Sequence, residues 1–156
     1  RAGAGVTPWR AERGEWSGAS GFEEADRVLA GSEWPDAILV ANDQMALGVL
    51  RACAAKGIAV PTQISVIGYD DTTDSAWFTP PLTTVRQAFK DAGQQSVEWL
   101  EARLKSDAED LSRRQLAVTL VTRGSTARVD EAAAASETLA RLQALATAAL
   151  RLTGRE

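Results

Sequence analysis

The chain has 156 residues, 45% of them hydrophobic and 24% charged, which suits one ordinary globular domain and excludes wholesale disorder, a fibrous protein or a membrane-spanning one. It has no histidine and a single cysteine, which excludes histidine-dependent nucleophilic catalysis, Cys/His zinc sites and an internal disulfide within these residues. A net charge of −4 does not fit a free-standing nucleic-acid-binding domain, although DNA contacts can lie elsewhere in a longer protein.

The first half of the chain alternates helix and strand patterns. Ser17 is a suitable N-cap for a helix whose apolar residues are spaced by three and four, and Gly31 is expected to end that helix. Residues 37–41 form a short continuous apolar run, which predicts a strand buried on both faces. A second helix is expected to begin at Asn42 and to stop at Gly57.

The pattern repeats further along the chain. Residues 64–69 predict another buried strand, and two strand-to-helix units of this kind favour an α/β layer with a parallel sheet. Residues 79–82 contain two prolines and are expected to be extended, as in a crossover or hinge strand. A helix is predicted from Gln87, and a last strand at 116–121. Cys53 falls on an apolar helix face and is expected to be a buried small side chain.

The composition changes after Arg128, where Ala, Leu, Glu and Arg dominate and predict a long helix. Its apolar side chains alternate spacings of three and four, as in a short coiled-coil seam, at Leu142, Leu145, Ala149 and Leu152. An amphipathic helix that docks on its own domain is the alternative. We therefore expect a core over residues 1–126, a linker over 127–135 and an oligomerisation helix over 136–153.

Polar side chains follow the two predicted inner strands. Asn42 and Asp43 follow the first, and Asp70 and Asp71 end the second, at the sheet edge where ligands of parallel sheets bind. Amide and carboxylate groups suit the hydroxyls of a neutral sugar, but such residues are equally ordinary helix caps and turn residues. Trp16 either stacks on a sugar ring or belongs to the core. The Asp pair also leaves open a Mg²⁺-dependent enzyme.

Three blocks in order closely resemble the LacI/GalR family of bacterial transcription regulators, in its lac-type branch. They are ILVANDQMALG at 38–48, ISVIGYDDT at 64–72 and PPLTTVRQ at 80–87. The similarity runs from about Gly14 to the C-terminus, and the terminal Leu/Ala helix resembles the tetramerisation helix of that branch. The resemblance implies an α/β periplasmic-binding-protein-like core of two subdomains, a parallel sheet flanked by helices, with a sugar effector held between the subdomains.

The resemblance also implies roles for individual residues. Trp16 matches the aromatic residue that stacks on the sugar ring, Asn42 and Asp70 match partners of sugar hydroxyls, and Gln87 and Phe89 match further pocket contacts. The implied activity is ligand binding without catalysis, cofactor or metal. A β-galactoside is the expected effector class.

The same resemblance implies partners. Leu47, Trp77 and Phe78 fall where the family forms its dimer interface, and the terminal helix would join dimers into a homotetramer. Operator DNA would be bound by a helix-turn-helix expected before Arg1, in a cytoplasmic protein. The main alternative is the sugar-binding protein of a transport system, which shares the fold but carries an export signal.

Overall fold

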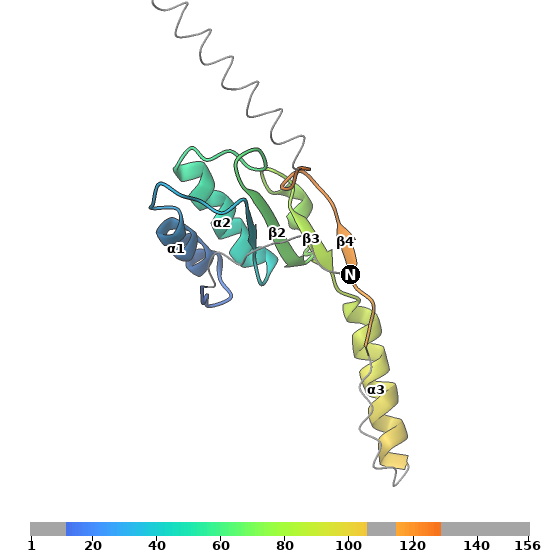
Figure 1. Cartoon of the computed structure of the whole chain (residues 1–156). Helices are drawn as coiled ribbons and strands as arrows, with labels where there is room; N and C mark the ends of the chain where they lie inside the picture. Colours follow the sequence, from blue (N-terminus) through green and yellow to red (C-terminus); the bar gives the residue numbers. More distant parts are fainter. Residues whose placement is uncertain (1–11, 106–114, 129–156) are drawn as a thin grey trace, which may run out of the picture.

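The computed structural model describes residues 12–105 and 115–128. Within them, helices and strands follow one another as α1 (Gly18–Val28), β1 (Ala37–Leu39), α2 (Asp43–Ala55), β2 (Ser65–Asp70), the 3₁₀ helix η1 (Ser75–Trp77), β3 (Thr83–Arg86), α3 (Phe89–Lys105) and β4 (Thr119–Val121). The strands form one sheet in the order β1-β2-β3-β4 (Figure 1). The first three are parallel and β4 runs antiparallel to β3, so the sheet is mixed, and the expected α/β class is confirmed.

The first two helices begin where the sequence predicts. Ser17 and Asn42 are the N-caps of α1 and α2, and each accepts a hydrogen bond from a backbone N–H three residues later, at 3.1 Å and 2.7 Å respectively. α2 ends just before Gly57, whose φ of +70° suits the residue after a helix. α1 ends at Val28, earlier than the predicted stop at Gly31.

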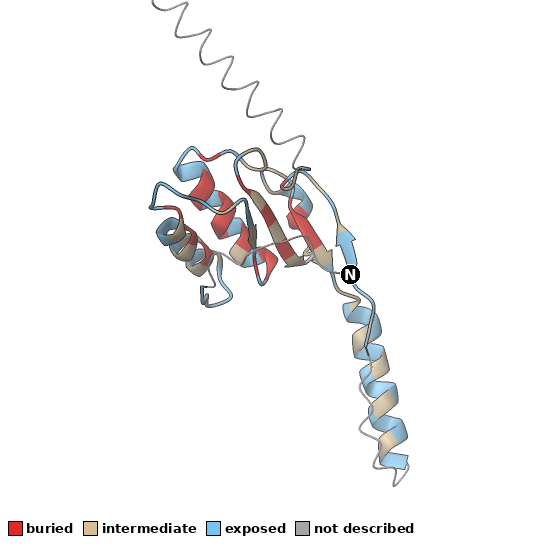
Figure 2. Cartoon of the chain, viewed as in Figure 1, coloured by how far each residue is buried: buried red, intermediate tan, exposed pale blue. Residues whose placement is uncertain are grey.

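The core lies between α2 and one face of the sheet, and α1 packs on α2 (Figure 2). Ile64, Val66 and Leu82 from the sheet side and Cys53 from α2 are almost completely buried. Burial raises the pKa of the Cys53 thiol, as expected for a small core side chain. A 2.8 Å ion pair between Lys56 and Asp26 joins the two helices at their edge.

The prediction that residues 37–41 form a strand buried on both faces is wrong. β1 spans only Ala37–Leu39, and the Leu39 side chain is 76% exposed, whereas Val40 is buried. The physical reason is position: β1 lies at the edge of the described sheet, where it pairs only with β2, and the helix that packs on the sheet, α2, contacts β2. A continuous apolar run therefore indicates a strand but not how many of its faces are covered.

The second half differs from the prediction in two ways. The crossover from β2 to β3 contains the short helix η1 (Ser75–Trp77), which the sequence did not predict, followed by a cis Thr79–Pro80 peptide bond in the stretch expected to be extended. α3 begins at Phe89 and extends away from the sheet with no buried residue, because none of the other described elements packs along it (Figures 1 and 2). β4 begins at Thr119, three residues later than predicted.

The predicted oligomerisation helix at 136–153 lies outside the described residues. This includes all four predicted seam residues, Leu142, Leu145, Ala149 and Leu152. In the parts of the chain that the structure describes, no helix has both the length and the apolar character needed to cross a lipid bilayer.

Candidate functional site

The structure brings two of the predicted site residues into direct contact. Asp70 is the last residue of β2, and Gln87 follows the end of the neighbouring strand β3. The Gln87 side-chain amide donates a hydrogen bond to Asp70 Oδ1 at 2.7 Å. Because β1, β2 and β3 are parallel, Asn42 also lies at this carboxyl edge of the sheet.

Asn42 and Trp16 form a second pair. The Asn42 side chain is buried, and besides capping α2 it donates from Nδ2 to the Trp16 carbonyl oxygen at 3.3 Å. Both polar ends of the amide therefore have partners within the protein. Trp16 as a whole residue is 70% exposed, so it does not belong to the core. A flat apolar ring left in solvent beside polar strand ends is a suitable platform for a sugar ring.

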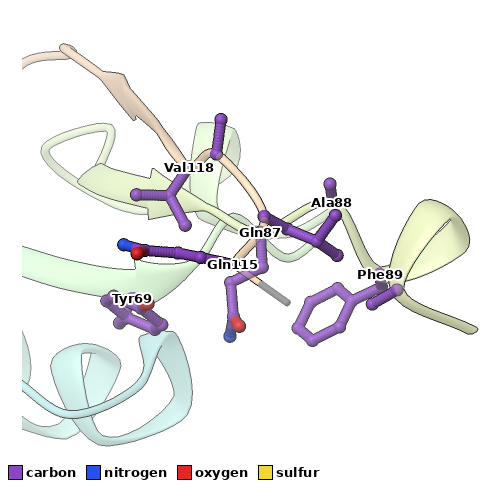
Figure 3. Close-up of a pocket in the computed structure, with 9 residues that line it drawn as sticks. Tyr69, Gln87, Ala88, Phe89, Gln115 and Val118 are labelled. Atoms are coloured by element: carbon purple, nitrogen blue, oxygen red, sulfur yellow. The ribbon is translucent and has the colours of Figure 1, made fainter. Parts of the chain in front are cut away.

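A cavity of about 330 Å³ opens where the chain passes from β3 into α3 and where it returns toward β4 (Figure 3). Its walls are Tyr69 of β2, residues 87–89 with Ala92, and residues 115–118. Two predicted site residues, Gln87 and Phe89, thus line one cavity, at the lower end of the volume range of small-molecule sites. Trp16, Asn42 and Asp70 are not among its lining residues.

The two consecutive aspartates have separate partners. Asp71 accepts from Arg86 Nε at 2.6 Å and from an Arg123 guanidinium nitrogen at 2.5 Å, whereas Asp70 accepts from Gln87. Burial raises the pKa of the Asp71 carboxyl, but hydrogen bonds from the two arginines and their charges outweigh burial and hold it below its usual value. Among the described residues no group of three or more potential ligands could hold a metal ion.

Sequence analysis did not predict the arginine partners of Asp71. Arg86 sits opposite Asp70 in the β2–β3 register, and Arg123 lies just after β4. Arg123 also donates to the Leu82 carbonyl oxygen at 2.7 Å, so it connects three segments. No local sequence pattern predicts this contact, because Asp71 and Arg123 are separated by 52 positions.

Sequence analysis grouped Asp43 with the other strand-end residues, although the structure gives it a different environment. Its side chain is fully buried beneath the turn that follows β2. It accepts hydrogen bonds from three donors, the Thr72 backbone and the hydroxyls of Ser75 and Thr84. A signal did exist: Gly68 interrupts a strand, and glycine inside a strand often marks a close approach.

Of the residues predicted to form a dimer interface, Leu47 lies on α2, Trp77 ends η1 and Phe78 directly follows η1. Trp77 is 85% exposed and Leu47 42% exposed, whereas Phe78 is half-buried and packs against the core. Trp77 therefore places a large apolar side chain in solvent, which is the usual property of an interface anchor.

The chain is similar in sequence to a protein-family model and to known proteins. A family model described as a periplasmic binding protein-like domain matches residues 1–126. The lactose operon repressor of Escherichia coli is 44% identical over 121 residues, a stretch that covers 78% of this chain and 33% of that protein. The transcriptional repressor PurR of Pasteurella multocida is 35% identical over 124 residues, 80% of this chain and 37% of that protein.

A solved structure is similar to this chain in fold as well as in sequence. The lac repressor dimer bound to operator and the anti-inducer ONPF matches with a TM-score of 0.70 and 45% identity. The match covers 74% of this chain and 40% of that one. The chain thus spans about a third of the length of these curated relatives.

Proposed function

This chain belongs to the LacI/GalR family of transcription regulators and has its periplasmic-binding-protein-like fold, and from that premise we propose that it is the effector-binding portion of a sugar-responsive repressor. The matched relatives are transcriptional repressors and not enzymes. The proposed effector is a sugar, with a β-galactoside as the expected class, because the lac-type relative is the more similar of the two.

The observation that carries the sugar proposal is the composition of the carboxyl edge. Asp70 and Gln87 present a carboxylate and an amide within 2.7 Å of each other, and Gln87 also lines the cavity. Such groups accept from and donate to hydroxyls, and they carry no cation that would select a phosphorylated ligand. The exposed Trp16 ring and Phe89 supply the apolar surfaces that the faces of a sugar ring require.

The proposed mechanism is a population shift in the intact protein. A sugar that binds one arrangement of the two subdomains more tightly than the other favours that arrangement. Coupling of about 1–3 kcal/mol between effector and operator sites, typical of allosteric proteins, then lowers operator affinity. We propose that operator binding resides in a helix-turn-helix outside this chain, and that the protein acts in the cytoplasm as a homodimer or, through its terminal helix, a homotetramer.

The decisive experiment replaces Asp70 with alanine in the intact protein. Binding to a promoter fragment is measured by gel mobility shift, with and without methyl β-D-galactoside. Asp70→Ala is expected to retain DNA binding and to lose release by the sugar, since the carboxylate that would bind a hydroxyl is gone. Asp74→Ala is the matched control, because Asp74 lies in the same loop, is exposed and makes no side-chain capping bond.

Two results would contradict the proposal. If Asp70→Ala responds to the sugar as the wild type does, the site assignment is wrong. If the wild-type protein binds the sugar but no promoter DNA, the chain belongs to a transport binding protein instead.

A further inference from the structure

Asp43 is a fully buried carboxylate that the ligand site does not use directly. Its Oδ2 accepts from the Thr72 backbone N–H at 2.9 Å and from the Ser75 hydroxyl, and its Oδ1 accepts from the Thr84 hydroxyl at 2.6 Å. As the first residue of α2 it also lies at the positive end of the helix. The buried charge is therefore balanced by donors from two other segments, the loop after β2 and strand β3.

The loop that Asp43 holds directly follows Asp70, the proposed sugar-binding carboxylate at the end of β2. Asp70 has a φ of +116° and Asp71 a φ of +57°, in backbone regions that residues with side chains rarely adopt. Such conformations persist only where the surroundings over-determine them. Thr72, whose backbone N–H donates to Asp43, directly follows this pair. The Thr84 hydroxyl, which donates to Asp43, also accepts a hydrogen bond from the Asp71 N–H at 3.4 Å.

The strand beside Asp43 is shaped to admit the carboxylate. A Cβ added at Gly68 would lie 2.3 Å from Asp43 Oδ1 and 2.7 Å from the Leu82 side chain. Only glycine leaves the space that the carboxylate occupies. Asp43 follows β1 and Gly68 lies in β2, far apart in sequence. The shape of one therefore fits the other.

We propose that Asp43 is the positioning residue of the effector site: its buried carboxylate holds the turn that directly follows Asp70 and so fixes the end of β2 from which Asp70 meets the ligand. This inference rests on the proposed function and names the residue that makes Asp70 effective. Asp43 itself does not touch the sugar.

The test uses Asp43→Asn in the intact protein, which keeps the size of the side chain but removes one acceptor. Affinity for methyl β-D-galactoside is measured by calorimetry and is expected to fall about tenfold, the scale of one lost hydrogen bond to a charged group. Amide hydrogen exchange of the 70–75 segment is expected to speed up. Exchange within α2 beyond its first turn should stay as in the wild type.

A double-mutant cycle separates positioning from general destabilisation. If Asp43 acts through Asp70, then Asp43→Asn with Asp70→Asn binds the sugar no more weakly than Asp70→Asn alone. Ser125→Ala is the control, because Ser125 is also fully buried, donates to the Val66 carbonyl at 2.6 Å and accepts from the Thr83 N–H at 2.8 Å. It should lower the unfolding temperature and leave sugar affinity unchanged.

The outcomes distinguish the two proposals. Additive losses in the double mutant, an equal loss in Ser125→Ala, or unchanged exchange at 70–75 in Asp43→Asn each overturn the positioning role while the sugar site stands. A wild-type affinity in Asp70→Asn overturns the sugar site itself, and the positioning role with it.

Discussion

At the scale of single residues, the chemistry of this edge depends on how neighbouring carboxylates are paired. Asp70 meets an uncharged amide and stays available to a polar ligand, whereas Asp71 is held by two arginines and Asp43 by three hydrogen-bond donors. The three carboxylates differ because of their partners and not because of their residue type. Sequence alone predicted polar groups at the strand ends and could not assign these separate roles.

The Asp71 network predicts a pH dependence of stability. Its folded pKa lies below the ordinary value of about 3.9, so the ion pairs stabilise the fold above that pH, and the contribution is lost as the pH falls through the lower folded pKa. Arg123→Gln should lower the free energy of unfolding at pH 7 and make its loss in acid smaller. Urea unfolding at pH 7 and at acid pH measures both effects.

The control for this prediction is Lys105→Gln. Lys105 pairs with Glu101 at 3.6 Å, and both side chains are largely exposed, so little stability is expected from that pair. If the Lys105 and Arg123 variants have the same effect at pH 7, the partly buried Asp71–Arg123 pair contributes no more than a surface ion pair.

At the scale of elements, close backbone packing joins α1 to α2, the helix that packs on the sheet. A Cβ at Gly48 of α2 would lie 2.0 Å from the Gly18 carbonyl oxygen, and one at Gly21 of α1 would lie 2.2 Å from the Met45 carbonyl oxygen. Each helix thus places a glycine against the backbone of the other. The helices were predicted from apolar spacing, but the depth of their contact depends on these two small residues.

Gly48→Ala is therefore expected to destabilise the protein although alanine is the better helix former. The added methyl group meets backbone that cannot move aside, and overpacking of this kind costs about 1–3 kcal/mol. Gly93→Ala in α3 is the matched control, because nothing lies within 4 Å of its added Cβ, and it should gain up to about 1 kcal/mol from helix propensity. Thermal unfolding measures both effects: the unfolding temperature should fall in Gly48→Ala and rise in Gly93→Ala.

At the scale of the whole molecule, the described residues leave large apolar surfaces in solvent. Trp77 is 85% exposed on η1, and Leu104 of α3 and Leu39 of β1 are each more than three-quarters exposed. Surfaces of this kind are typical of contacts with other protein segments. We propose that the dimer interface uses two of these exposed side chains, Trp77 and Leu47.

Trp77→Ala should weaken the proposed dimer of the intact protein. Loss of an aromatic anchor at the centre of an interface costs about 2 kcal/mol or more, equivalent to about thirtyfold in the dissociation constant. Sedimentation analysis over a range of concentrations measures the change. Trp34→Ala is the control: Trp34 is also exposed but lies in the loop before β1 and donates from its ring nitrogen to Gly31. An equal effect in both variants would refute the interface.

The terminal helix makes a separate prediction about assembly. Deleting residues after Arg128 should halve the mass of the intact protein from tetramer to dimer, because the predicted heptad seam joins dimers. Analytical ultracentrifugation that finds the same mass before and after the deletion would favour a helix that docks on its own domain.

Local patterns were enough to predict much of this protein. Cap residues and apolar spacing placed α1 and α2, short apolar runs placed β1 and β2, and three motif blocks indicated the family, which the comparisons confirmed. These features depend on residues close together in the chain, so sequence carries them directly. The resemblance implied that Asp70 and Gln87 belong to one site, but it did not predict the hydrogen bond between them.

Tertiary structure alone decided the rest. The exposure of Leu39, the ion pairs of Asp71 and the burial of Asp43 under a glycine of the neighbouring strand all depend on which segments meet in space. Arg123 lies 52 positions from its partner, and the antiparallel return of β4 brings it there. A side chain's environment is set by such long-range contacts, and residue type and local spacing do not contain them.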